Sequence, residues 1–107
     1  MALAVAKEFP DVIVLQCRTA AEALSILRTE KVDALITDNR MPEMTGIEMI
    51  RQIRRQDCLI PILMVTGTEQ LRAAAFEAGV SSFTSSGSWE EVRRRIREFV
   101  REQPRDS

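Results

Sequence analysis

Ala34-Leu-Ile-Thr-Asp38-Asn-Arg-Met-Pro42-Glu-Met-Thr-Gly46 is an apolar run that stops at an aspartate and continues through Met-Pro to glycine. This pattern predicts a buried strand at 34–37, then a turn, then a helix after Gly46. Asp38 would lie at the carboxyl end of that strand. In open parallel sheets ligands and chemistry collect at this edge, because strand ends and loops form a crevice there. Asp38 is therefore the first candidate for a functional residue.

The rest of the chain alternates short apolar runs with segments of helical period, which is typical of βαβ units. We therefore predict an α/β fold with a parallel sheet and helices on both faces. The predicted strands are 12–17, 34–37, 62–65 and 82–85, and the predicted helices are 20–29, 47–56, 69–78 and 89–102. Three helices begin with a capping-box pattern, a hydroxyl followed three residues later by glutamate, in the pairs Thr19/Glu22, Thr45/Glu48 and Ser88/Glu91. With 107 residues, we expect a single domain over 1–107.

The composition argues against several classes of function. Lys and Arg number 15 against 16 Asp and Glu, so no global field would draw the protein to nucleic acid or to an anionic membrane. Histidine is absent, which removes imidazole general bases and histidine zinc sites. The longest strongly apolar run, 59–65, is too short to span a membrane, and no pattern of a secretory leader is visible. A cytoplasmic protein without a membrane or nucleic-acid partner is expected.

Three groups of residues, namely arginines, cysteines and methionines, are interpreted as structural rather than functional. The arginines of the last predicted helix alternate with glutamates at ion-pairing spacing, which favours a solvated amphipathic helix over a nucleic-acid face. Cys17 and Cys58 lie far apart with no partner motif, so both are expected to be reduced packing residues. The methionines, including Met41, Met44 and Met49, are interpreted as packing residues too. A soft-metal site is disfavoured because no cysteine or histidine joins them in the sequence.

The stretch around Asp38 resembles the phosphoacceptor segment of bacterial response regulator receiver domains. That segment consists of an apolar strand, Asp, two residues, Met-Pro, one residue, Met, Asp or Asn, and Gly, and only Thr45 departs from it. The resemblance covers nearly the whole chain. It implies a flavodoxin-like sheet with strand order 2-1-3-4-5. It also implies a signalling domain of a two-component phosphorelay rather than an enzyme, with a sensor histidine kinase as its partner.

The resemblance also implies roles for individual residues. Asp38 matches the phosphoacceptor, and Arg40 matches the residue whose backbone carbonyl binds Mg²⁺. Thr66 matches the switch hydroxyl and Phe83 the switch aromatic. Ser86 stands where the family has a lysine.

A second departure from the family concerns the start of the sequence. Receiver domains begin with an apolar strand that ends in two acidic residues, whereas this sequence starts inside what resembles the first helix, residues 2–9. Mg²⁺ favours near-octahedral oxygen coordination, so Asp38 with the Arg40 carbonyl would make a weak Mg²⁺ site at best, or none. Phosphoryl transfer depends on cations that neutralise the phosphoryl oxygens. Asp38 is therefore expected to be phosphorylated slowly, if at all.

The family's first strand is central in its sheet, so its loss predicts a gap of about 10 Å between the strands at 12–17 and 34–37. Buried backbone groups left unsatisfied there would cost roughly 1–3 kcal/mol each. The two strands could pair directly, residues 2–6 could supply a strand, or two chains could pair edges. We expect the third solution, a homo-oligomer.

Other interpretations of Asp38 stay open. Taken alone, it could be a turn-former that bonds its own following backbone. A pseudo-receiver that acts through protein contacts without phosphorylation is the main alternative function. A phosphatase of the haloacid dehalogenase type is disfavoured because its second aspartate would stand where Arg40 is. A nucleotide-binding module is disfavoured because no Gly-rich turn follows any predicted strand.

Overall fold

The computed structural model describes residues 13–85 and 88–102. In these residues four parallel strands form one sheet in the order β1-β2-β3-β4. The strands are β1 (Val14–Gln16), β2 (Ala34–Thr37), β3 (Ile62–Val65) and β4 (Ser82–Thr84). The helices are α1 (Ala20–Thr29), α2 (Gly46–Arg55), α3 (Arg72–Ala78), which follows the 3₁₀ turn η1 (Glu69–Leu71), and α4 (Trp89–Glu102). The predicted parallel α/β fold is confirmed.

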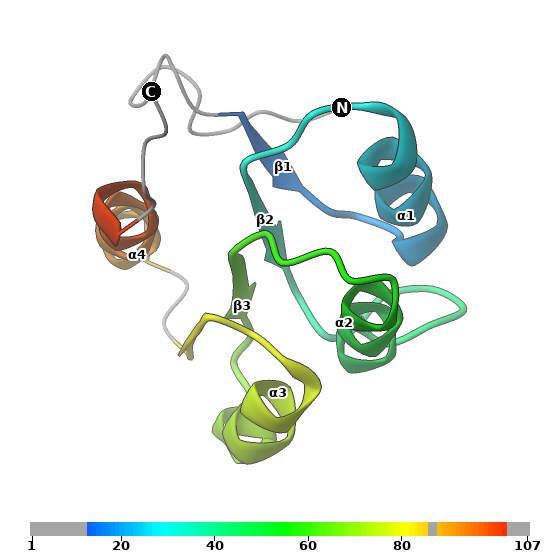
Figure 1. Cartoon of the computed structure of the whole chain (residues 1–107). Helices are drawn as coiled ribbons and strands as arrows, with labels where there is room; N and C mark the ends of the chain where they lie inside the picture. Colours follow the sequence, from blue (N-terminus) through cyan, green and yellow to red (C-terminus); the bar gives the residue numbers. More distant parts are fainter. Residues whose placement is uncertain (1–12, 86–87, 103–107) are drawn as a thin grey trace.

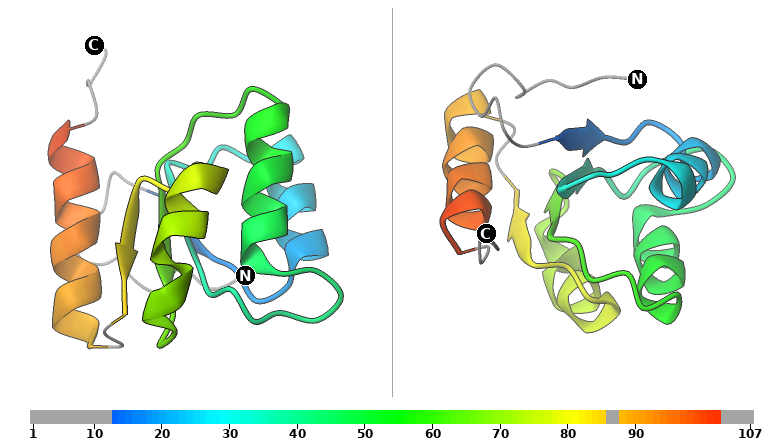
Figure 2. Two further views of the ribbon diagram at one scale, coloured as in Figure 1. Left: turned by 90° about the horizontal axis from the view of Figure 1, so that it is seen from below. Right: turned by 45° about the horizontal axis from the view of Figure 1, so that its top comes forward.

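The helices form two layers around the sheet. Helices α1, α2 and α3 cover one face, and among the described helices α4 is the one on the other face (Figures 1 and 2). Side chains alternate across each strand, so β2 contributes Leu35 to the core under α1–α3 and Ile36 to the smaller core under α4. All four residues of β2 are buried. The strand that precedes Asp38 is therefore an inner strand, as the continuous apolar run predicts.

The expected gap beside β2 does not exist. Strand β1 pairs directly with β2 in parallel, with Val14 opposite Ala34, and the amide of Cys17 donates to the carbonyl of Ile36 at 2.9 Å. Of the three arrangements that could close the gap, direct pairing of the two strands is the observed one, and the expected arrangement, pairing of edges between two chains, is not needed there. Direct pairing satisfies the same backbone groups within one chain. The expected helix at 2–9 and the alternative strand at 2–6 lie outside the described residues.

Three helix starts follow the capping pattern of the sequence. At Thr45 the capping box is complete, since its hydroxyl accepts from the amide of Glu48 at 3.2 Å while its own amide donates to the Glu48 carboxylate at 3.0 Å. At Thr19 the hydroxyl accepts from the amide of Glu22. At Ser88 it accepts from the amide of Glu91. The predicted helix starts are therefore confirmed.

The third predicted helix differs from the observed one in its first turn. Residues 69–71 form the 3₁₀ turn η1, and the α-helix proper begins only at Arg72. Thr68, the residue before η1, makes no capping bond through its side chain. The helix ends at Gly79, whose φ of +120° lies in the region that favours glycine. The hydrophobic pattern predicted the segment, but the tighter first turn depends on hydrogen bonds that the pattern does not encode.

Ion pairs connect residues three and four positions apart in helix α4, as its alternating charges predict. The Glu91 carboxylate contacts Arg94 at 2.7 Å and Arg95 at 2.8 Å, and Arg94 also reaches Glu98 at 3.6 Å. These contacts support the interpretation of a solvated amphipathic helix.

Within the described ranges, no helix combines the length and the apolar character that crossing a membrane requires.

Candidate functional site

Asp38 directly follows β2, and its side chain is exposed at the carboxyl end of the sheet. Its Oδ1 accepts hydrogen bonds from the backbone amides of Asn39, at 2.6 Å, and Arg40, at 3.4 Å. The carboxylate thus makes the local bonds of a turn-former. These bonds also orient the group, because they fix one of its two oxygens toward the following backbone.

Asn39 connects the loop after Asp38 to the start of α2. Its backbone carbonyl accepts from the amide of Gly46 at 2.8 Å, and its side-chain oxygen accepts from the amide of Ile47 at 3.1 Å. Both donors belong to the first turn of α2, whose amides lack partners within the helix. Asn39 therefore caps this helix from outside and holds the loop at 38–46 closed. This role of Asn39 was not predicted from the sequence, although asparagine is a common partner for free helix amides.

Thr66 lies at the same edge of the sheet as Asp38. It directly follows β3, is half-buried, and donates its amide to the carbonyl of Thr84 at 3.1 Å. Strands β2 and β3 are neighbours, with Thr37 opposite Met64. The structure therefore places the two candidates at the ends of adjacent strands. The Thr66 hydroxyl accepts from the amide of Thr68 at 3.4 Å.

Phe83 is fully buried in β4, opposite Met64 of β3. The guanidinium carbon of Arg72 lies 4.8 Å from the centroid of its ring, within the range of a cation–π contact. Arg72 is held in turn by the carboxylate of Glu69, at 3.1 Å from Nη2 to Oε1. A hydrogen bond from Arg72 lowers the pKa of Glu69. Phe83 was predicted as a site residue, whereas Arg72 was not. The i,i+3 spacing of Glu69 and Arg72 in the sequence could have indicated their ion pair.

The remaining predicted site residues contribute less to the described geometry. Arg40 is exposed and donates its amide to Asp38. Ser86 lies outside the described residues. In the described part of the chain, no three Asp, Glu, His or Cys side chains gather where they could hold a metal ion. One carboxylate and one backbone carbonyl fall short of the oxygen set that Mg²⁺ favours.

A cluster of sulfur atoms corrects one sequence interpretation. The Sγ of Cys17 lies 3.5 Å from the Sδ of Met41 and 3.8 Å from the Sδ of Met49. A cysteine does join the methionines in space, although none is near them in the sequence. Cys17 is free and buried, as is expected of a reduced packing residue, and Cys58 is free and half-buried. Burial raises the pKa of the Cys17 thiol, so this thiol is a poor nucleophile.

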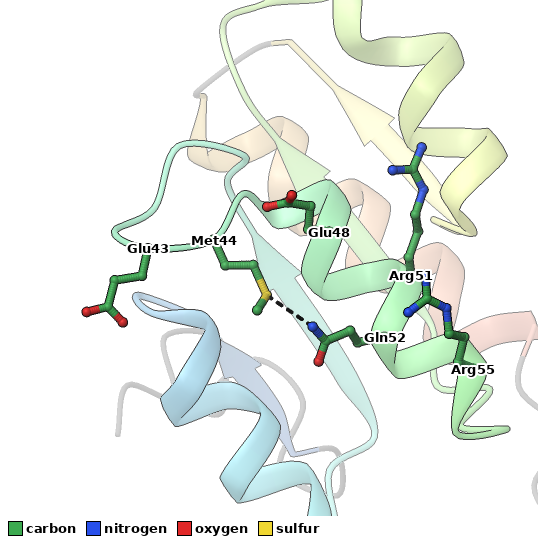
Figure 3. Close-up of a pocket in the computed structure, with 6 residues that line it drawn as sticks. All are labelled: Glu43, Met44, Glu48, Arg51, Gln52 and Arg55. Atoms are coloured by element: carbon green, nitrogen blue, oxygen red, sulfur yellow. Dashed lines mark hydrogen bonds between the residues drawn. The ribbon is translucent and has the colours of Figure 1, made fainter.

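Two of the hollows in the described part of the chain lie on the helical face. The first has a volume of about 390 Å³ and runs along α2, where it is lined by Glu43, Met44, Glu48, Arg51, Gln52 and Arg55 (Figure 3). Glu43 lies in the loop before α2 and Glu48 in the first turn of α2, whereas both arginines lie in the second half of the helix, so the hollow offers no uniform charge to a ligand. The second, of about 160 Å³, is lined by residues of α1, α2 and the loop after α2, namely Leu24, Leu27, Ile53, Gln56 and Cys58.

Comparison with known proteins agrees with the geometry at Asp38. The family model for the response regulator receiver domain matches residues 2–86. The chain belongs to this family. Receiver domains are signalling domains, and this membership is consistent with an exposed aspartate at the carboxyl end of an inner strand.

Two curated relatives show how much of a response regulator this receiver domain represents. The cyclic di-GMP phosphodiesterase response regulator RpfG of Xanthomonas campestris is 38% identical over 78 residues, which cover 69% of this chain and 21% of RpfG. The alkaline phosphatase synthesis transcriptional regulatory protein PhoP of Bacillus subtilis is 32% identical over 91 residues, which cover 82% of this chain and 38% of PhoP. The chain thus spans well under half the length of either relative.

Solved structures share the fold of this receiver domain. A two-component response regulator from Clostridium difficile superposes with a TM-score of 0.77 at 16% identity, covering 94% of this chain and 84% of that one. The receiver domain of a sensor histidine kinase from Pseudomonas aeruginosa superposes with a TM-score of 0.69 at 21% identity, covering 78% and 73%. That structure has a magnesium ion coordinated in its active-site cleft. The flavodoxin-like fold predicted from the sequence is confirmed.

Proposed function

We propose that this receiver domain accepts a phosphoryl group at Asp38 from a sensor histidine kinase, and that it does so slowly. The observation that carries the proposal is the exposed carboxylate at the carboxyl end of β2, beside Thr66 at the end of β3. A donor molecule can reach this edge because Asp38 is exposed. Family membership over residues 2–86 supports the same role.

The transfer needs a carboxylate oxygen free to attack. The amides of Asn39 and Arg40 hold Oδ1 of Asp38, whereas Oδ2 accepts no hydrogen bond from the described residues. In the proposed step, Oδ2 attacks the phosphorus of a phosphohistidine on the kinase and a new O–P bond forms. The P–N bond breaks, and the imidazole leaves with its electron pair. The product is an aspartyl phosphate.

The rate is limited by the shortage of positive charge near Asp38. The phosphoryl group carries negative charge on three oxygens, and catalysis depends on groups that neutralise it. Asp38 and the Arg40 carbonyl are the described donors for Mg²⁺, and they support weak binding at most. Ser86 replaces the family's lysine and supplies no ammonium group.

The proposed output is a change in protein contacts rather than a reaction on a small molecule. The main alternative is a module that binds partners without any phosphorylation. The exposed Asp38 and the family membership favour the phosphorylated form of signalling. A change in affinity for the kinase or another signalling partner on phosphorylation would support the proposal, and an unchanged affinity would support the alternative.

We also propose self-association of the chain. The reason is the presence of outer strands in the described sheet, and not a gap beside β2. Strands β1 and β4 are the outer strands of the described sheet, and outer strands can pair with a second chain. Light scattering of the purified chain at high micromolar concentration tests this. A homo-oligomer supports edge pairing, and a monodisperse monomer contradicts it.

Phosphorylation itself is tested with the small donors acetyl phosphate and phosphoramidate. Slow gain of one phosphoryl group, followed by intact mass, is the expected result. The variant Asp38→Asn should gain none. Asp57→Asn is the matched control, because Asp57 is exposed at the far end of α2 and has a positive φ that asparagine tolerates. Equal incorporation in Asp38→Asn and the parent would refute Asp38 as the acceptor.

A further inference from the structure

We propose that Cys17, Met41 and Met49 form a binding site for a soft monovalent metal ion, Cu(I) or its redox-inert analogue Ag(I). The three residues come from separate elements. Cys17 directly follows β1, Met41 lies in the loop after Asp38, and Met49 lies in α2. The fold brings their sulfur atoms together, and no other part of the proposed function depends on them.

The spacing of the sulfur atoms fits a shared ion. Sulfur ligands stand about 2.3 Å from a bound metal, so two on one ion at roughly 100–120° lie about 3.5–4.0 Å apart. The Sγ of Cys17 lies 3.5 Å from the Sδ of Met41 and 3.8 Å from the Sδ of Met49. Both distances fall in this range, so little movement is needed for the ion to enter.

The donor set selects the class of metal. Thiolate and thioether ligands favour Cu(I) over the harder divalent ions. Zn²⁺ would require further nitrogen, oxygen or thiolate ligands, and among residues 13–85 and 88–102 no three His, Cys, Asp or Glu side chains lie where they could hold a metal ion. The ion replaces the thiol proton of Cys17, and this proton passes to water.

The three residues differ in burial. Met49 is fully buried and Cys17 is 9% exposed, whereas Met41 is half-buried and reaches toward the surface. The Thr37 hydroxyl, which donates to the carbonyl of Asp38 at 2.8 Å, also lies 3.8 Å from the Sδ of Met41. The sulfur atom of Met41 is therefore already positioned beside Cys17. A bound ion would tie the loop at 38–46 to β1 and α2.

Titration of the full chain with Ag(I) tests the site. The second thiol is first removed by Cys58→Ser, so that Cys17 is the single thiol present. Native mass spectrometry should show one Ag(I) per chain, and competition with a chelator gives its affinity. Met41→Leu and Met49→Leu should each weaken binding by about tenfold or more, since a thioether ligand is lost while side-chain volume is kept.

Met44→Leu is the matched control, because the sulfur atom of Met44 contacts Gln52 at 3.8 Å rather than Cys17. This variant should bind as tightly as the parent. Circular dichroism confirms that each variant is folded. X-ray absorption of the Cu(I)-loaded chain should show three sulfur neighbours. The proposal is overturned if no ion binds, or if Met41→Leu and Met49→Leu bind as tightly as Met44→Leu.

Discussion

A Cβ atom at residue 46 would stand 2.3 Å from the carbonyl oxygen of Asp38 and 3.0 Å from the Cα of Asn39. Helix α2 therefore begins directly against the backbone of the proposed phosphoacceptor. Only glycine leaves room for this approach, since the atoms in the way are backbone atoms that cannot rotate aside. The position of Asp38 is thus set from both sides, by β2 before it and by the start of α2 after it.

The variant Gly46→Ala should lower the free energy of unfolding by about 1–3 kcal/mol, the usual cost of overpacking. Urea denaturation measures the change. Gly67→Ala is the control, because a Cβ at that position meets nothing within 4 Å. Equal stability of the two variants would show that the contact between α2 and Asp38 is not tight.

Arg54 is predicted to stabilise the fold by connecting α2 to the loops that follow α2 and α3. Its Nε and Nη2 donate to the carbonyl of Gly79, at 3.0 and 2.8 Å, and its Nη1 donates to the carbonyls of Cys58 and Ile60, at 2.8 and 2.9 Å. Arg54→Met should lower the free energy of unfolding by roughly 1–3 kcal/mol, because half-buried carbonyls lose their partners. Arg55→Met, at an exposed neighbouring position, should change the unfolding free energy little. A similar decrease in the free energy of unfolding in both variants would refute this stabilising role of Arg54.

The ion pairs of α4 predict a loss of stability in acid. Hydrogen bonds from Arg94 and Arg95 lower the pKa of Glu91 from its ordinary value of 4.5. A lowered pKa in the folded state means that the contribution is complete above the unfolded pKa and disappears as the pH falls through the folded one. Thermal unfolding between pH 6 and about pH 3 should therefore show a smaller acid-induced drop for Glu91→Gln than for the parent chain.

Glu90→Gln, which removes the same charge from an exposed neighbouring position, is the control for that experiment. Its acid-induced drop should match that of the parent. High salt should reduce the difference between Glu91→Gln and the parent, because surface pairs are screened. An identical pH dependence in all three proteins would contradict a contribution from Glu91.

Restoring the family's lysine should speed phosphorylation. The variant Ser86→Lys adds an ammonium group where receiver domains have one, and a cation lowers the barrier by neutralising charge on the phosphoryl oxygens. An increase of about tenfold or more in the rate of phosphate gain is expected, followed by intact mass. Ser86→Met, which adds length without charge, should leave the rate unchanged. A rate for Ser86→Lys no higher than that for Ser86→Met would count against the charge-shortage explanation.

Much of the fold could be predicted from local patterns. Strand β2 and helix α1 begin and end where the periodicity placed them, and Thr45 caps α2 with the predicted partner Glu48. These features depend on residues within one turn or one strand of each other. The position of Asp38 at the sheet edge followed for the same reason, because an apolar run ended directly before it.

The contacts that were missed join residues far apart in the sequence. The sulfur cluster around Cys17 and the bonds from Arg54 to Gly79 are set by packing. No periodic pattern encodes them. Direct pairing of β1 with β2 was one of three arrangements left open, because the family's strand order does not say how the sheet closes when one strand is missing.

The central claim is slow phosphorylation at Asp38, and the most direct test follows the intact mass of the parent chain and of Asp38→Asn during incubation with phosphoramidate and Mg²⁺. The account predicts that the parent gains a single phosphoryl group slowly and incompletely, while Asp38→Asn gains none. Rapid stoichiometric phosphorylation would contradict the shortage of positive charge. A parent chain that never gains phosphate, or an Asp38→Asn variant that gains it as the parent does, would contradict Asp38 as the acceptor.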